Sequence, residues 1–335
     1  MVISNFEFSK QHVQKVINPA FSYTGENYDQ WKVEARQKLR DLLGMDKFDL
    51  CDSDMQIEFE EKHEGFTEIR FTFQSEEGYR VPCHIWLPDG IENPPIMICL
   101  QGHSKGMHIS LGRPKFDGEE DVIKNGDRDF SVRAIKEGFA AVAMEQRNLG
   151  ESATAPGRIS CKDGGMNALL IGRTTIGERV WDVCRLIDVL EKHFADKVDL
   201  SNLCCMGNSG GGTTTTYVAA LEDRIKLVMP SCSNSTYKDS IGRIDHCTCN
   251  YIPNIGNVFE MGDLIAMSYP KYYVQVNGKD DNLFPIDGAK EVFAAGKRVW
   301  EEHGEAEKIE HVIGEAGHRF YADISWPVVH KMLGK

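Results

Sequence analysis

The pentapeptide Gly207-Asn208-Ser209-Gly210-Gly211 constrains the fold of this chain more than any other feature, because of what surrounds it. An apolar run at 202–208 precedes the serine, and a helix-forming stretch at 211–221 follows it. Glycines on both sides let the backbone turn sharply between a strand and a helix, with Ser209 Oγ projecting above the sheet. We therefore expect a strand–turn–helix unit that presents Ser209 as a nucleophile, against the alternative of an ordinary serine in a glycine-rich turn.

The rest of the chain predicts an α/β fold. Helical spacing of apolar residues at 28–44, ending at Gly44, indicates a helix in an N-terminal extension. Three strand-like runs without helices between them indicate antiparallel edge strands, and the runs that follow alternate with helices, as in a mostly parallel, doubly wound sheet. The expected strands lie at 55–62, 66–74, 79–88, 94–102, 139–146, 202–208, 225–232, 271–278 and 307–313, and the later helices at 131–138, 173–193, 211–221, 286–303 and 323–333. We divide the chain into a helical extension, 1–54, packed on a catalytic domain, 55–335.

A serine nucleophile needs a base, and the base needs a carboxylate that orients it. The strand end at 274–285 offers Asp281, three residues after a glycine, and Asp280 as the alternative acid. His318 lies in a loop after the last expected strand, in the string GEAGHRFY, which favours it as the base over His303, His311 and His330. The order serine, acid, histidine is the one that strand–turn–helix nucleophiles use.

Two backbone amides are expected to stabilise the oxyanion. One is the amide of Gly210, and the other is that of His103 in the loop after the first parallel strand, with Ser104 as second choice. The His103 side chain either lines the pocket or faces solvent. We expect Gln101, Ser104 and His246 to contribute to substrate binding.

Three further groups have structural or chemical interpretations. Glu145 and Arg147 are expected to pair across a polar loop, and Arg179 and Asp182, one helical turn apart, to form a structural pair. The string from Asp245 to Asn250, DHCTCN, resembles a metal-binding sequence, but no second Cys or His pair stands at finger spacing. We therefore expect a pocket wall there and no metal site.

Composition narrows the classes of function. A net charge of −13 argues against DNA, RNA or anionic membranes as partners, and no run of apolar residues is long enough to span a bilayer. The polar start and adjacent Cys204 and Cys205 in an apolar run predict a cytoplasmic protein with reduced thiols, unless a leader peptide is missing. We expect no cofactor, a small-molecule partner, and homo-oligomers as an option.

Together these strings make the chain similar to the acetylxylan-esterase-like branch of the α/β-hydrolases, near the dienelactone hydrolases. The resemblance extends over most of the chain and includes WKVEARQKLRDLLG, LQGHSKG, GERVWDVCRLIDVL, GNSGGG, DHCTCNYIPNI, NGKDDNLFP and GHRFY. It implies the α/β-hydrolase fold, a triad of Ser209, Asp281 and His318, and hydrolysis of carboxylic esters, with carbohydrate acetyl esters as candidates. Dienelactone hydrolases use cysteine as nucleophile, whereas serine occupies that position here.

The chain departs from the similar cephalosporin deacetylases at three places. Their R-G-Q-G loop is replaced by a string that begins at Arg147, and Gly210 and Arg319 stand where they have Gln and Glu. These departures leave the ester unassigned. A peptidase or amidase of the same fold, or a binding protein that kept the fold without the chemistry, are the alternatives.

Overall fold

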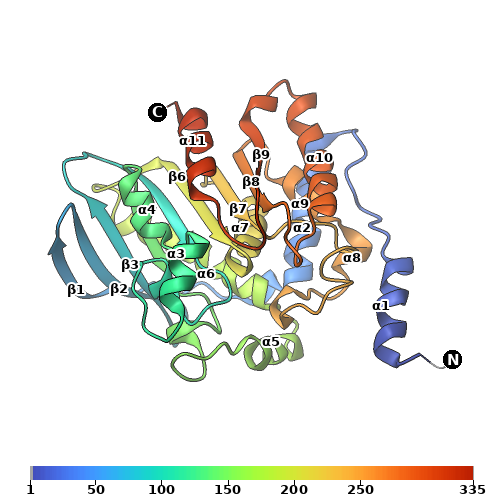
Figure 1. Ribbon diagram of the computed structural model, residues 1–335, viewed down its shortest axis with the longest axis horizontal. Coiled ribbons are helices and arrows are strands. Elements are labelled where there is room, and N and C mark those ends of the chain that lie inside the picture. Colours follow the sequence, from blue (N-terminus) through green and yellow to red (C-terminus); the bar gives the residue numbers. More distant parts are fainter. Residues whose placement is uncertain (1–2, 335) are drawn as a thin grey trace.

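The computed structural model describes residues 3–334, and these form a single mixed sheet covered by helices on both faces (Figure 1). The strand order is β1-β2-β3-β5-β4-β6-β7-β8-β9. The strands are β1 (Gln56–His63), β2 (Phe66–Glu76), β3 (Tyr79–Pro88), β4 (Pro95–Leu100), β5 (Ala140–Met144), β6 (Asp199–Asn208), β7 (Leu227–Ser231), β8 (Tyr272–Gly278) and β9 (Ile309–Gly314).

The sheet changes once from antiparallel to parallel pairing, as the sequence predicts. Strands β1, β2 and β3 pair antiparallel, and β3 pairs antiparallel with β5. From β5 across to β9 every neighbouring pair is parallel. Because parallel strands all end at one edge of a sheet, the loops after β4, β6, β8 and β9 gather at that edge.

Two hydrophobic cores lie on opposite faces of the sheet. Along β4, Ile96, Ile98 and Leu100 belong to one core and Met97 and Cys99 to the other, which is the alternation expected of a strand buried on both faces. The helices are α1 (Asn5–Val16), α2 (Tyr28–Leu43), α3 (Glu119–Gly126), α4 (Phe130–Lys136), α5 (Cys161–Leu170), α6 (Thr175–His193), α7 (Gly210–Leu221), α8 (Ile255–Val258), α9 (Met261–Met267), α10 (Ile286–Glu302) and α11 (Ala322–Leu333). Residues of α2, α6, α7, α9 and α10 fill the larger core, and residues of α4 and α11 fill the smaller one.

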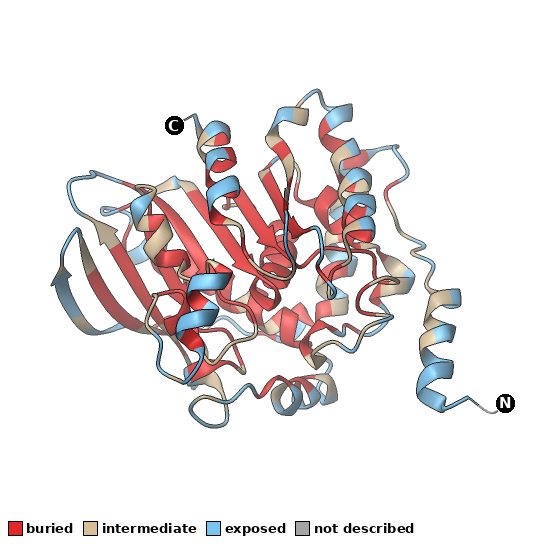
Figure 2. Cartoon of the chain, in the orientation of Figure 1, coloured by how far each residue is buried: buried red, intermediate tan, exposed pale blue. Residues whose placement is uncertain are grey.

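The N-terminal helices differ in how they contact this body. In α2, Ala35, Leu39 and Leu43 are fully buried, and Gly44 ends the helix with a φ of 72° as predicted. Helix α1 buries none of its residues and lies along the side of the molecule (Figure 2). Within the described residues no helix combines the length and apolar character needed to cross a bilayer.

The predicted strands and helices are present, with ends that differ by a few residues. Helices α1, α3, α5, α8 and α9 were not predicted. Two of them have weak sequence signals for physical reasons: α5 carries Gly164 and Gly165 in its interior, and α1 has little buried face to show a periodic pattern.

Candidate active site

Ser209 lies in a sharp turn between β6 and α7. Its backbone has φ 55° and ψ −121°, a combination that residues with a Cβ adopt only when the surrounding structure enforces it. The Ser209 amide donates to Ser231 O at 2.8 Å, and Ser209 O accepts from the Thr213 amide at 2.8 Å. Both the strand and the helix therefore hold the strained residue, as in a nucleophile elbow.

Close backbone approach explains the glycines after the serine. A Cβ on Gly211 would lie 2.0 Å from Leu100 O, so only glycine lets α7 begin this near β4. A Cβ on Gly210 would lie 2.8 Å from Cε1 of His103, because the imidazole ring packs against this residue. The glycine at 210 thus makes room for a specific side chain from the loop after β4.

A buried carboxylate orients His318. His318 Nδ1 hydrogen-bonds Asp281 Oδ2 at 2.8 Å, and Asp281 Oδ1 accepts from the amides of Leu283 at 2.8 Å and Phe284 at 3.1 Å. Burial favours the neutral acid, but the hydrogen bond and charge of His318 and the two amides outweigh it and hold the pKa of Asp281 below its ordinary value. The side chain of Asp281 is fully buried, whereas Asp280 is exposed, so of the two candidate acids Asp281 is the one against the histidine.

Ser209 and His318 border the same cavity, of about 300 Å³, at the carboxyl edge of the sheet. Its remaining lining residues are His103, Arg128, Asp245, His246, Cys247, Asn250, Leu283 and Phe284. A larger hollow of about 370 Å³ lies between α1 and the segment 237–257, but its lining includes none of Ser209, Asp281 and His318. The smaller cavity is therefore the candidate site, since it holds the reactive groups.

Cys232 lies next to the Asp281–His318 pair and is the rival nucleophile by position. Its Sγ is within 4.8 Å of both partners, and it donates to Arg319 O at 3.2 Å. Burial, with a contribution from the charge of Asp281, raises the pKa of the Cys232 thiol to about 12. The thiol therefore stays protonated, which disfavours Cys232 as the nucleophile.

The loop after β4 is fixed from beneath by Glu145, which follows β5. Glu145 Oε1 accepts from Gln101 Nε2 at 2.7 Å, and Oε2 accepts from the amides of Met107 and Glu151, both at 3.2 Å. Burial raises the pKa of Glu145 to about 7, although these donors oppose the shift. Gln101 is 1% exposed and is used in this contact, so the structure gives it a supporting position and not the substrate-contacting one that we expected.

Of the other two expected binding residues, one borders the cavity and the other does not. His246 lines the cavity, with Nε2 3.0 Å from Ser240 Oγ and its ring edge-on to Phe284. The Ser104 hydroxyl turns back on its own loop and contacts the amide and carbonyl of Gly106. Of this pair only His246 is placed to touch a ligand in the cavity.

The expected pair of Glu145 with Arg147 is wrong. Arg147 instead makes a bidentate ion pair with Asp182, with Nε–Oδ2 and Nη2–Oδ1 distances of 2.8 Å. The expected pair of Arg179 with Asp182 is wrong for the same reason: Asp182 binds Arg147 and Ser75, and Arg179 donates to the backbone carbonyl of Arg147. Local spacing suggested both pairs, but tertiary contacts between β5, β2 and α6 determine the partners.

Sequence reasoning missed Arg128. Its guanidinium borders the cavity, and Nη1 would lie 3.4 Å from a Cβ on Gly102. Among the described residues no carboxylate is within ion-pair distance of Arg128, which leaves a cation facing the cavity. The sequence gave little indication of this position, because Arg128 lies in a polar segment, NGDRD, whose composition is typical of a surface loop.

The sequence also did not reveal that the cysteines of the DHCTCN string meet side chains from distant segments. Asp245, His246, Cys247 and Asn250 form a wall of the cavity, as expected. Cys247 and Cys249, however, lie against His103 and Cys161, and one potential ligand atom of each of the four is within 4.8 Å of the others. Finger spacing within the sequence gave no hint of this cluster, because its other two members, His103 and Cys161, come from two different segments of the chain.

Comparisons with known proteins agree with this architecture. The sequence profile of the family "Glucuronyl esterase, fungi" matches residues 96–242, which is less than half of the chain. The Bacillus subtilis (strain 168) protein named "Putative hydrolase YtaP" is 24% identical over 295 residues, covering 86% of this chain and 94% of its own.

Solved structures with the same fold include several esterases. A "putative acetyl xylan esterase" from Bacteroides fragilis NCTC 9343 superposes with a TM-score of 0.76 at 14% identity, over 98% of this chain and 84% of that one. A glucuronoyl esterase from Solibacter usitatus gives 0.68 at 13% identity, over 95% and 94%. With the strand order and the turn at Ser209, these matches show that the chain has the α/β-hydrolase fold.

Proposed function

We propose that this α/β-hydrolase-fold chain is a serine esterase that cleaves small carboxylic esters, with esters of carbohydrates as the substrate class. The observation that carries the proposal is the convergence of a strained serine and a carboxylate-oriented histidine on one cavity. The profile match to glucuronyl esterases and the fold shared with acetyl xylan and glucuronoyl esterases support esters over other acyl compounds.

The residues would act in two acyl-transfer steps. His318 takes the proton of Ser209 as Oγ attacks the ester carbonyl, and the alcohol leaves with that proton. Asp281 holds the imidazole in the tautomer that carries the Nδ1 proton and stabilises the cation that forms. Water, deprotonated by His318, then attacks the acyl-enzyme; the bond between the acyl carbon and Ser209 Oγ breaks, His318 returns the proton to Oγ, and the acid leaves.

The oxyanion would be stabilised by the amide of Gly210, at the N-terminus of α7, and by that of His103. The twelve-residue helix α7 adds positive potential at its first turn. Arg128 supplies a further cation at the cavity, which suits an acidic or strongly polar substituent near the scissile ester.

An amidase of the same fold is the second candidate, since the same triad serves both reactions. The test is a panel of acetylated sugars, methyl esters of uronic acids, aryl acetates and aminoacyl anilides. We expect turnover of esters with the anilides at least 100-fold slower in kcat/KM. An anilide that is the best substrate of the panel contradicts the ester assignment, and inertness towards the whole panel supports a binding protein.

The uronic acid esters of the panel also test the role of Arg128. A charged hydrogen bond contributes about 1.5–3 kcal/mol, so Arg128→Met should lower kcat/KM roughly tenfold or more for a substrate whose acidic group Arg128 binds. Turnover of a neutral aryl acetate should change much less.

A further inference from the structure

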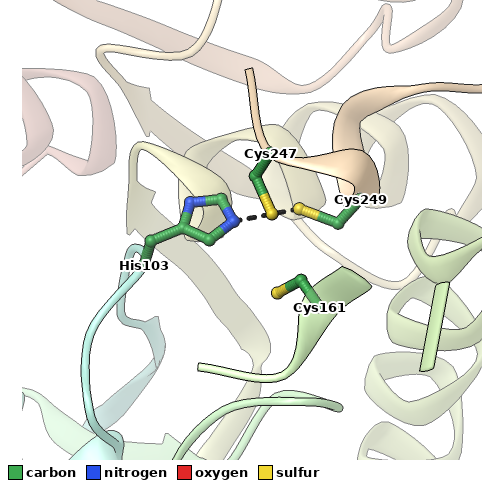
Figure 3. A group of neighbouring side chains, drawn as sticks. All are labelled: His103, Cys161, Cys247 and Cys249. Carbon is green, nitrogen blue, oxygen red and sulfur yellow. Dashed lines mark hydrogen bonds between the residues drawn. The ribbon is translucent and has the colours of Figure 1, made fainter. Parts of the chain in front are cut away.

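Three cysteines and a histidine from separate segments converge beside the catalytic cavity (Figure 3). His103 comes from the loop after β4, and Cys161 begins α5. Cys247 precedes the single turn Thr248–Asn250, which comes before α8, and Cys249 lies within it. All four potential ligand atoms lie within 4.8 Å of one another, and His103 Nε2 is 3.0 Å from Cys249 Sγ. The esterase mechanism proposed above uses none of these side chains.

The spacing is close to that of a tetrahedral metal site. Bonds of about 2.3 Å to sulfur and 2.0–2.1 Å to nitrogen put tetrahedral ligand atoms roughly 3.5–3.8 Å apart. The four side chains therefore need to shift by only about 1 Å to close around one ion. Cys161 and Cys249 are buried, and together with Leu149 they form a small apolar cluster of their own, so solvent has little access from the core side.

A buried arginine gives an independent argument from charge. Arg179 is fully buried, and its Nη2 lies 3.3 Å from Cys161 Sγ. The ion pairs of residues 3–334 include none with Arg179; its other hydrogen bonds go to the carbonyl of Arg147, and Nη1 is buried with no partner. A buried cation without a compensating anion is costly. Three neutral thiols would leave it uncompensated, whereas a divalent ion held by three thiolates and a neutral imidazole has a net charge of −1.

We propose that His103, Cys161, Cys247 and Cys249 bind one structural Zn²⁺ ion. Three thiolates and an imidazole are a common ligand set for zinc, and four protein ligands close the coordination sphere, as in structural sites. The ion would fasten the loop after β4, the start of α5 and the wall of the cavity to one another. Arg179 would neutralise the centre and donate to one of its sulfurs.

The site would also fix one side of the oxyanion hole, a consequence that depends on the proposed esterase function. The His103 ring packs against Gly210, where a Cβ would lie 2.8 Å from Cε1. Zinc bound at Nε2 would hold the ring, and with it the backbone of His103, in a fixed place relative to the Gly210 amide. This accounts for the glycine after the nucleophile, since a Cβ there would clash with the ring.

The first test is metal content, which does not depend on catalysis. Full-length protein purified under reducing conditions without a metal-affinity column should carry about one zinc per chain by inductively coupled plasma mass spectrometry. Cys247→Ser should lose most of it, and so should Cys161→Ser. Cys51→Ser is the matched control, because Cys51 is half-buried like Cys247 but donates to Gln74 O, outside the cluster; it should keep its zinc.

A second measurement uses only the wild-type protein, so it remains informative even if the cysteine variants fold poorly. X-ray absorption at the zinc edge of the wild type should fit three sulfurs at about 2.3 Å and one nitrogen at about 2.0 Å. Zinc absent from the wild type both as purified and after addition of Zn²⁺ to the reduced protein would overturn the proposal. So would a shell of oxygen and nitrogen alone, unchanged zinc in Cys247→Ser and Cys161→Ser, or a disulfide among the three thiols in place of metal.

The link to the oxyanion hole has its own readout. Removing zinc with a chelator should lower kcat on an aryl acetate at least tenfold while KM changes little, and adding Zn²⁺ back should restore it. Bound zinc with no such effect would leave the metal site standing and remove its connection with catalysis. Inactivity of the zinc-loaded protein would count against the esterase proposal alone.

Discussion

At the scale of single residues, the site depends on side chains whose conformations are enforced by neighbours. Ser209 keeps a φ of 55° because its amide donates to Ser231 O at the end of β7 and its carbonyl accepts from the Thr213 amide in the first turn of α7. Two amides of its own loop hold Asp281 Oδ1, and the other carboxylate oxygen faces His318. Such preorganisation is what an acyl-transfer site requires, since the groups must be in place when charge develops.

Asp281 and Asp280 form a natural matched pair for testing the acid. Asp281→Asn should lower kcat roughly 10²- to 10⁴-fold, because an amide facing His318 Nδ1 favours the wrong tautomer of the imidazole. Asp280→Asn should change kcat less than about threefold, since this side chain is exposed. Steady-state kinetics on an aryl acetate decides between them, and a larger loss at Asp280 would mean that the acid is wrongly assigned.

At the scale of elements, the sequence predicted what periodicity and chain order control. Apolar runs and glycines predicted strands β1 to β9 and the turn at Ser209, and the order of elements placed Asp281 after β8 and His318 after β9. The sequence did not predict the contacts between loops that are distant along the chain. The partners of Arg147, the supporting role of Gln101 and the meeting of His103 with Cys161, Cys247 and Cys249 all depend on how three loops fold over the sheet edge, which no local pattern encodes.

The buried carboxylate under the loop after β4 gives an element-level prediction of pH dependence. The pKa of Glu145 rises from 4.5 to about 7 on folding, so the folded state binds more protons than the unfolded state between these values. Stability from this group is therefore fully present below pH 4.5 and is lost as the pH rises to about 7, by an amount on the order of 3 kcal/mol.

Glu145→Gln should flatten this part of the stability curve. Urea unfolding at several pH values between 4.5 and 7 should show a smaller decline for the variant than for the wild type. Some decline should remain, because burial raises the pKa of Glu260 to about 7 as well. Parallel curves for the two proteins would show that Glu145 does not titrate in this range.

At the scale of the whole molecule, helix α2 of the N-terminal segment is part of the folded body. Helix α2 contributes Ala35, Leu39 and Leu43 to the same core that α6 and α7 fill behind the sheet. Tyr28 Oη reaches Ala266 O at 2.7 Å, and Arg36 reaches Leu221 O at 2.6 Å. The chain therefore folds residues from its beginning and its middle around one sheet.

This continuity predicts different costs for two substitutions in α2. Leu39→Ala should lower the free energy of unfolding by about 2–5 kcal/mol, because it leaves a cavity in a core where the side chain is fully buried. Val33→Ala, in the same helix at 71% exposure, should change it by less than about 0.5 kcal/mol. Denaturant unfolding measures both, and equal effects would mean that α2 does not share the catalytic core.

The central claim is that Ser209 is the nucleophile, and covalent labelling tests it most directly. A fluorophosphonate should add once to the native protein, and peptide mass spectrometry should locate the adduct on Ser209. Ser209→Ala should take up no label and lose several orders of magnitude in kcat on an aryl acetate while unfolding at the wild-type temperature. An unlabelled wild type, a label at another residue, or full activity in Ser209→Ala would contradict the account.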